Sequence, residues 1–240
     1  MKYFKTYESF KGTEFLKDPV KIKAWLDEME IKNYTIGKDG KVDVNGRVVI
    51  SKEQIKKIPV QFRKVDEFFV CFDNQLTSLK GAPEKVGGDF YCNRNQLTSL
   101  KGAPKEVGGD FWCHYNQLTS LEGAPNKVGK NFICYNNKLI SLEGAPEKVG
   151  GDFGCYNNQL INLVGMPNVR GTVEFNNNRG IPSEILYEVY KLMKKNKTDW
   201  DTEIKKYIQY DPTIIKYLPK EELKRLGLDK ESKLKSGGLL

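Results

Sequence analysis

The sequence has few of the residues from which common catalytic and metal sites are built. It contains a single histidine, His114, and its five cysteines never form a Cys-x-x-Cys pair, which argues against a zinc site. There is also no Gly-x-x-x-x-Gly-Lys loop that could hold a phosphate. His114 and Cys113 are neighbours on an expected strand, so they point to opposite faces and cannot act as a base and nucleophile. We therefore expect a non-enzymatic protein without cofactor or metal, with His114 on the surface.

Long apolar runs are missing too. No stretch approaches the 18 apolar residues of a membrane span, and residues 1–8 lack the apolar segment of a secretory signal. We expect a cytoplasmic protein that has no membrane partner.

Positive charge is in excess but is not concentrated. The formal net charge is +8, with 10 Lys/Arg against 8 Asp/Glu in residues 1–47, 16 against 13 in residues 48–180, and 13 against 10 in residues 181–240. Nucleic acids are bound by basic clusters that neutralise several phosphates. The even distribution therefore argues against a specific nucleic-acid partner.

A repeat of 21 residues dominates the middle of the chain. The cysteines Cys71, Cys92, Cys113, Cys134 and Cys155 are all spaced by this period, and the unit reads F-x-C-x-x-N-Q-L-T-S-L-x-G-A-P-x-x-V-G-G-x. A strict period of this length is typical of a solenoid in which one small unit is stacked along an axis. The five cysteines should then form one internal column of reduced, buried thiols.

Each unit is expected to contribute one short parallel strand. The Phe-x-Cys pair recurs while the residue between varies, and period-2 alternation sends the constant residues inward. The Gly-Ala-Pro segment and the Gly-Gly pair predict a compact, irregular return without a helix.

Two polar columns accompany the strand. An asparagine follows the strand in each unit and should satisfy backbone groups at the turn, as at Asn95 and Asn116. The acidic column of Asp89, Asp110 and Asp152 is expected to consist of solvated turn residues rather than cation ligands.

These motifs resemble the leucine-rich repeat. Phe90-x-Cys92-x-x-Asn95-x-Leu97 is similar to the core L-x-L-x-x-N-x-L, with Phe and Cys replacing two leucines. The variant with Leu-Thr-Ser-Leu-x-Gly-Ala-Pro looks like repeats of bacteriophage and other bacterial proteins, and the resemblance covers about residues 48–180. It implies a parallel solenoid that binds other proteins.

The flanking segments are predicted to be caps. Residues 1–47 should form a helix from about Asp18 to Glu30 and a hairpin at residues 42–48 with an Asn-Gly turn. After the solenoid at 48–180, residues 181–228 should form a helical cap, with helices near 183–196, 201–210, 211–218 and 220–227. Residues 229–240 are expected to be a disordered tail.

The variable outward residues of the strands are the best candidate for a functional site. They comprise an aromatic patch with one arginine: Phe72, Tyr91, Arg94, Trp112, His114, Tyr115, Ile133, Tyr135 and Tyr156. Tyr, Trp and Arg dominate protein-binding hot spots. We therefore predict a protein partner, such as a host defence protein that a phage protein blocks in the host cytoplasm. The alternative is that the flanking helices cover the patch, or that the aromatics only favour strand formation.

Two other functions remain open from the sequence. Residues 1–10 resemble the leader of internal head proteins of T4-like phages, and Leu26-Asp27-Glu28 fits their L-x-E processing pattern, which indicates a virion or head-packaged protein. The stacked aromatics would also suit a nucleotide or another small ligand with a planar ring.

Overall fold

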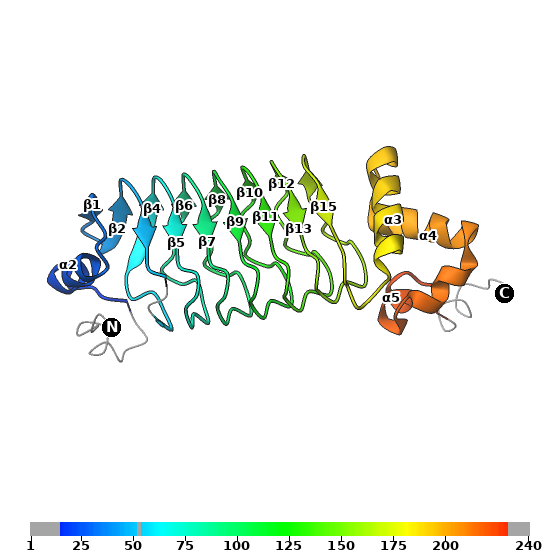
Figure 1. The fold of residues 1–240 in the computed structure, drawn as a ribbon, viewed down its shortest axis with the longest axis horizontal. Helices are drawn as coiled ribbons and strands as arrows, with labels where there is room; N and C mark the ends of the chain where they lie inside the picture. Colours follow the sequence, from blue (N-terminus) through cyan, green and yellow to red (C-terminus); the bar gives the residue numbers. More distant parts are fainter. Residues whose placement is uncertain (1–14, 52–53, 230–240) are drawn as a thin grey trace.

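The computed structural model describes residues 15–51 and 54–229, and its central part is a parallel β-solenoid (Figure 1). Two sheets run along the solenoid, parallel throughout except where the first two strands of the chain pair antiparallel, and helices lie at its two ends. The predicted fold class is confirmed. The head-protein leader expected at residues 1–10 and the tail expected after residue 229 lie outside the described residues.

The solenoid has an eight-stranded and a seven-stranded sheet. In spatial order the eight-stranded sheet contains β1 (Tyr34–Ile36), β2 (Lys41–Val44), β4 (Gln61–Val65), β6 (Lys85–Val86), β8 (Glu106–Val107), β10 (Lys127–Val128), β12 (Lys148–Val149) and β14 (Asn168–Val169). The seven-stranded sheet contains β3 (Val48–Val49), β5 (Phe69–Val70), β7 (Phe90–Tyr91), β9 (Phe111–Trp112), β11 (Phe132–Ile133), β13 (Phe153–Gly154) and β15 (Val173–Glu174). Equivalent residues pair directly, as Phe90 does with Phe111.

The expectation of one strand per unit is wrong, because each unit forms two. The second strand is the Lys-Val pair that follows Gly-Ala-Pro, as in β6 and β10. Only its valine points inward, so a two-residue strand between proline and glycine leaves no alternating pattern to detect. The period of 21 residues holds both sheets in register.

The core consists of columns of identical side chains. The rings of Phe69, Phe90, Phe111, Phe132 and Phe153 stack with centroid separations of 5.2–5.5 Å. All five cysteines are free and fully buried beside them, and burial raises the pKa of the Cys113 thiol well above its ordinary value. The predicted column of internal thiols is therefore confirmed.

The asparagine column is a hydrogen-bonded ladder inside the turn. Asn116 donates from Nδ2 to the carbonyl oxygens of Cys92 (3.1 Å) and Cys113 (3.0 Å), and its Oδ1 accepts from Leu97 N–H (3.0 Å). Each asparagine thus satisfies buried backbone groups of its own coil and of the preceding one, as the sequence predicts.

The acidic column is partly exposed, as expected of solvated turn residues, and it also forms a second ladder that the sequence does not predict. Asp89 Oδ1 accepts from the N–H of Asp110 (2.8 Å), and Asp110 Oδ1 accepts from the N–H of Asn131 (2.9 Å). Asn131 in turn accepts from Asp152 N–H at 2.7 Å. Asn can replace Asp here because the bond needs only an oxygen acceptor.

The corner at which the chain passes from the eight-stranded to the seven-stranded sheet is occupied by glycine in the middle coils. A Cβ atom built on Gly108 would overlap the carbonyl oxygen of Gly87 in the preceding coil. The Gly-Gly pairs therefore allow the close approach of backbones between coils.

The N-terminal end is covered by helix α2 (Pro19–Glu28) and a hairpin. Asp18 caps α2 by accepting from Val20 N–H at 2.8 Å, and Trp25 packs against Phe62 of the solenoid. The hairpin joins β1 to β2, so the hairpin predicted at residues 42–48 is wrong. Asn45-Gly46 instead forms the corner at which the chain passes from β2 to β3 of the other sheet.

The C-terminal end is covered by α3 (Ser183–Asn196), α4 (Trp200–Tyr210), the 3₁₀ helix η1 (Pro212–Tyr217) and α5 (Lys220–Arg225). The hydroxyl of Tyr187 in α3 accepts from Phe175 N–H at 3.0 Å, which closes the last coil. Buried Glu222 joins the helices to the solenoid, because it accepts from Trp200 Nε1 (2.8 Å) and Asn162 Nδ2 (2.9 Å). The helices predicted from residue 183 onward are all present.

Deleting one whole unit, residues 110–130, should leave a folded protein, because each coil contacts only its neighbours. Deleting only residues 110–119 should instead break the register of every column. Circular dichroism and thermal unfolding of both variants test this, and equal folding of the two would contradict the repeat assignment.

Replacing Asn116 with Ala should lower the free energy of unfolding by about 2–3 kcal/mol, because the buried N–H of Leu97 loses its acceptor. The exposed Asn126→Ala variant is the control and should change it by less than about 0.5 kcal/mol. Urea unfolding measures both, and equal stabilities would show that the ladder does not hold the coils.

Candidate binding surface

The outward side chains of the seven-stranded sheet form two adjacent rows, which we call the aromatic face. One row contains Val70, Tyr91, Trp112, Ile133 and Gly154, and the other contains Phe72, Asn93, His114, Tyr135 and Tyr156. Parallel stacking places equivalent residues of consecutive coils about 4.8 Å apart, so variable positions that are 21 residues apart in the sequence become neighbours. The predicted site residues of these rows therefore lie on one continuous surface.

The rings of the aromatic face stack along the solenoid axis. Tyr91 and Trp112 stack at 4.4 Å between centroids, His114 and Tyr135 at 4.4 Å, and Tyr135 and Tyr156 at 4.3 Å. The two rows meet where Trp112 lies 5.8 Å from His114. Apart from His114 these rings are half-buried. Each ring packs against its neighbours along the array, and its outer edge remains accessible to solvent.

Tyr115 and Arg94 border the aromatic face from an unusual backbone conformation. The residue after the second row is left-handed in every coil, and φ is 54° at Arg94 and 53° at Tyr115. Bulky residues rarely adopt this conformation, whereas Asn tolerates it, as at Asn136 and Asn157. The Tyr115 side chain is 46% exposed, and the Arg94 guanidinium lies 5.0 Å above its ring.

His114 is buried, so the prediction of a surface histidine is wrong. It is 7% exposed because Tyr135 stacks on one side of the ring and Trp112 and Tyr115 flank it. Burial, with a smaller contribution from the charge of Arg94, lowers the pKa of His114 to about 4. The imidazole is therefore neutral at physiological pH.

Three polar atoms of the aromatic face are buried without a hydrogen-bond partner among the described residues. They are Asn93 Oδ1, Trp112 Nε1 and His114 Nδ1, which belong to two adjacent coils. An unpaired buried polar atom costs about 1–3 kcal/mol. Packing of the rings in the middle of the face therefore leaves these three atoms unpaired.

The flanking helices do not cover the aromatic face. Figure 1 places α2 at one end of the solenoid and α3 to α5 at the other, with the strands β7 to β13 between them. The described helices contact the end coils, through Trp25 and Phe62 and through Tyr187 and Phe175. Among residues 15–51 and 54–229, the alternative that a helical cap buries the patch is therefore wrong.

Beside the aromatic face lies a groove, which we call the amide groove and which is not apparent from the sequence of a single repeat. It has a volume of about 680 Å³ and is lined by Tyr115, Asn116, Asn136, Asn137, Lys138, Asn157, Asn158, Gln159, Asn177 and Arg179. The asparagines of the ladder form its floor, and the left-handed column forms one wall. The signal in the sequence is the Asn-Asn pair of the later repeats, such as Asn136-Asn137. The first asparagine of each pair belongs to the left-handed column, and the second belongs to the ladder.

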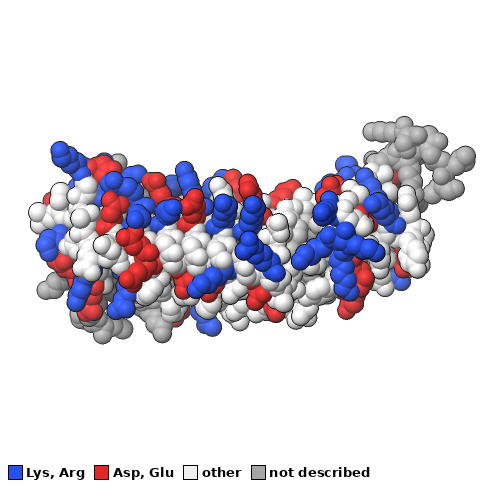
Figure 2. All heavy atoms as spheres, turned by 90° about the horizontal axis from the view of Figure 1, so that it is seen from above, with Lys and Arg blue, Asp and Glu red and all other residues white. Residues whose placement is uncertain are grey.

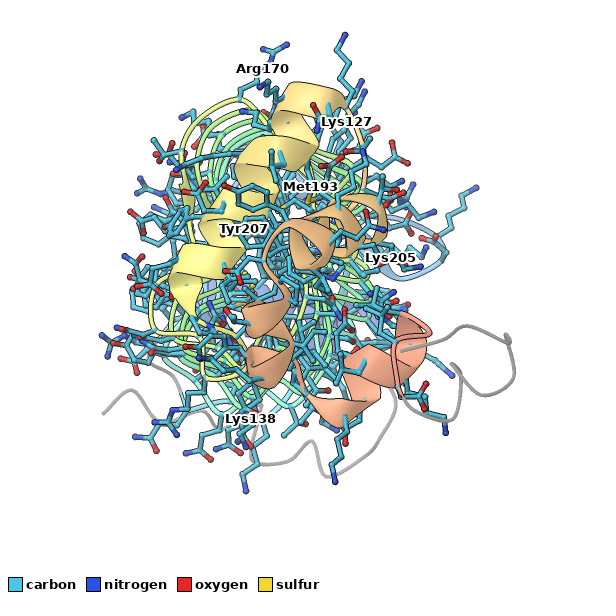
Figure 3. All side chains as sticks on the ribbon, turned by 90° about the vertical axis from the view of Figure 1, so that its right-hand side faces the viewer. Lys127, Lys138, Arg170, Met193, Lys205 and Tyr207 are labelled. Carbon is cyan, nitrogen blue, oxygen red and sulfur yellow. The ribbon has the colours of Figure 1, made fainter. Side chains whose placement is uncertain are left out.

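A second groove, of about 610 Å³, runs over the eight-stranded sheet. Its row of outward residues mixes charges, and Lys85 pairs with Glu106 at 2.9 Å. Figure 2 shows lysines, arginines and acidic residues interspersed along the solenoid. Viewed along the axis in Figure 3, Lys127 and Arg170 of this groove lie at the opposite end of the cross-section from Lys138 of the amide groove.

Comparisons with protein families, with curated proteins and with solved structures find no match to this chain. None of the described helices is long and apolar enough to cross a membrane. Within the described residues, no group of three His, Cys, Asp or Glu side chains is arranged to hold a metal ion.

Acid should destabilise the protein through His114. Because the folded pKa of about 4 lies below the ordinary value of 6.5, the unfolded chain binds the proton first as the pH falls. The contribution of His114 to stability is therefore present above pH 6.5 and is lost as the pH falls towards 4, at about 1.4 kcal/mol per pKa unit. NMR titration of the single imidazole measures the pKa directly, and a value near 6.5 would contradict burial of this ring.

Proposed function

We propose that this chain is a non-enzymatic protein-binding module, a solenoid of leucine-rich-repeat type, that binds its partner through the aromatic face. The observation that carries the proposal is the uncovered array of stacked Tyr and Trp rings in the middle coils. Tyr, Trp and Arg are the residue types enriched at protein-binding hot spots. The chain is proposed to act in the cytoplasm.

The geometry of the face supports this function because the rings are already ordered. Tyr91 stacks on Trp112 and also donates from its hydroxyl to Asp89 at 2.9 Å, so its ring has little freedom left to lose. Ordering a flexible side chain on binding costs about 0.5–1.5 kcal/mol. A face whose rings are fixed by stacking avoids most of that cost.

The place of Trp112 and His114 in the array supports a protein partner. Trp112 Nε1 and His114 Nδ1 lie among the rings, near the middle of the array. Hot spots concentrate in the middle of a protein interface, where solvent is excluded. Trp112 and His114 therefore lie where a protein partner would exclude solvent from the face.

A host defence protein as the target fits a phage origin, which is proposed from the repeat resemblance alone. The virion protein is the weaker alternative, because Leu26 of the L-x-E pattern is fully buried within α2 and a protease would have to unfold that helix. A small planar ligand is also weaker, because the rings of Tyr135 and Tyr156 already stack on each other at 4.3 Å.

Replacing Trp112 and Tyr135 with Ala should weaken partner binding by at least about 2 kcal/mol, since both rings lie in the middle of the face. The matched control is the exposed ion pair Lys101–Glu122, replaced by Ala at both positions, which should change binding by less than about 0.5 kcal/mol. Affinity purification with mass spectrometry identifies the partner, and calorimetry compares the variants. Binding lost in the control and kept in the aromatic variant would move the site away from this face.

A further inference from the structure

The amide groove has the polar groups to bind an extended chain. Asn136, Asn157 and Asn177 project from consecutive coils on one side, and Gln159 lies on the other. Asn and Gln amides both donate and accept hydrogen bonds, as a peptide backbone does. Since equivalent residues repeat about every 4.8 Å, the groove offers a regular series of such groups along the solenoid axis.

The charge of the groove has one sign. Its lining includes Lys138 and Arg179 and no aspartate or glutamate. Lys138 donates only to the neutral amide of Gln117, at 3.5 Å, and no described carboxylate pairs with Arg179. Some lysines elsewhere on the solenoid do pair with an acid of the next coil, as Lys85 does with Glu106. Both cations of the groove are thus available to an acidic ligand.

Tyr115 connects the groove to the aromatic face. It lines the groove, and its ring stands edge-on to Tyr135 at 5.5 Å. Holding a tyrosine in the left-handed region costs of the order of 1–3 kcal/mol, and Asn occupies the equivalent position in the next two coils at φ 52° and 53°. This strained residue is not buried in the core, since it is 46% exposed. Strain kept at an exposed position points to a role in binding.

We propose that the amide groove binds an acidic segment of the partner in the polyproline II conformation, with carboxylates three residues apart. The inference rests on the proposed function and names the chemistry of the partner. Polyproline II segments have no internal hydrogen bonds, so their backbone groups are free to bond with the groove amides. Their prolines pack on aromatic walls such as the one that Tyr115 provides.

The spacing of the cations matches this conformation. Lys138 and Arg179 occupy equivalent positions two coils apart, which is about 9.6 Å along the axis. One turn of polyproline II takes three residues and rises about 9.3 Å. Carboxylates at positions i and i+3 therefore face the same side and meet one cation each. A β-strand rises about 10 Å over three residues but turns its side chains at i and i+3 to opposite faces.

The test uses the full chain and fluorescein-labelled peptides, with affinity measured by fluorescence anisotropy at about 0.15 M salt. The probe is a four-fold repeat of Glu-Pro-Pro. A peptide of the same composition with its four glutamates contiguous tests the spacing, and a Lys-Pro-Pro repeat tests the charge. An oligogalacturonate of equal charge tests whether the groove prefers an acidic saccharide.

The Glu-Pro-Pro peptide should bind, and Lys138→Gln combined with Arg179→Gln should weaken its binding about five- to tenfold. The matched control combines Lys127→Gln with Arg170→Gln, which removes the same charge from the opposite groove and should change affinity less than about twofold. Tyr115→Asn should weaken binding while raising the thermal unfolding midpoint, because it removes the strained ring from a position that suits Asn.

Equal losses in the groove variant and its control would overturn the proposal, as would equal binding of the contiguous-glutamate or lysine peptide. Tighter binding of oligogalacturonate, or no binding of the Glu-Pro-Pro peptide, would also overturn it. These results leave the aromatic face untouched: if Trp112→Ala still abolishes partner binding, only the groove inference fails. If the Glu-Pro-Pro peptide binds as expected but Trp112→Ala leaves partner binding unchanged, the proposed role of the aromatic face is refuted and the groove inference stands.

Discussion

The asparagine ladder is the interaction on which the rest of this solenoid depends. Each coil turns out of the seven-stranded sheet at a point where Leu97 N–H and the Cys92 carbonyl, or their equivalents, face the core and have no strand partner. One amide side chain satisfies donors and acceptors of two coils at once, and so it fixes their register. Stacked phenylalanines and buried thiols can form columns only because this register is kept, since a slip of one residue would turn every core side chain outward.

The same constraint creates the surface. The turn at the ladder forces the preceding residue into the left-handed conformation in each coil, from Asp73 to Asn177. Asn and Asp relieve the strain at four of these positions, while Arg94 and Tyr115 bear it. The outward residues of the strands meet no such backbone constraint, whereas those of this column do. The two exceptions lie together, with the guanidinium 5.0 Å above the ring, beside the stacked rings of the aromatic face.

Much of the fold could be predicted from the sequence because the repeat presents each core position five times. The columns of Phe, Cys and Asn, the capped helix at Asp18 and the helices from Ser183 onward all follow from spacing and capping residues. The second sheet could not be predicted, because a two-residue strand such as Lys85–Val86 has no alternation. The burial of His114 depends on Tyr135 from the next coil, and the amide groove is formed by residues of several coils, so neither is visible within one unit.

Rigidity links the fold to the proposed activity. A solenoid held by backbone ladders presents its outward residues at fixed spacings along the axis, about 4.8 Å for each coil. A ligand with a repeating conformation can then be matched to that spacing without rearrangement of the protein. The stacked rings provide contact area for a partner in the middle coils. The cations Lys138 and Arg179 of the neighbouring groove set the direction of a bound segment, because they lie towards the C-terminal end of the array. An acidic segment that leads from the aromatic face into the groove would therefore bind in one orientation along the axis, since the reverse orientation would carry its carboxylates away from both cations.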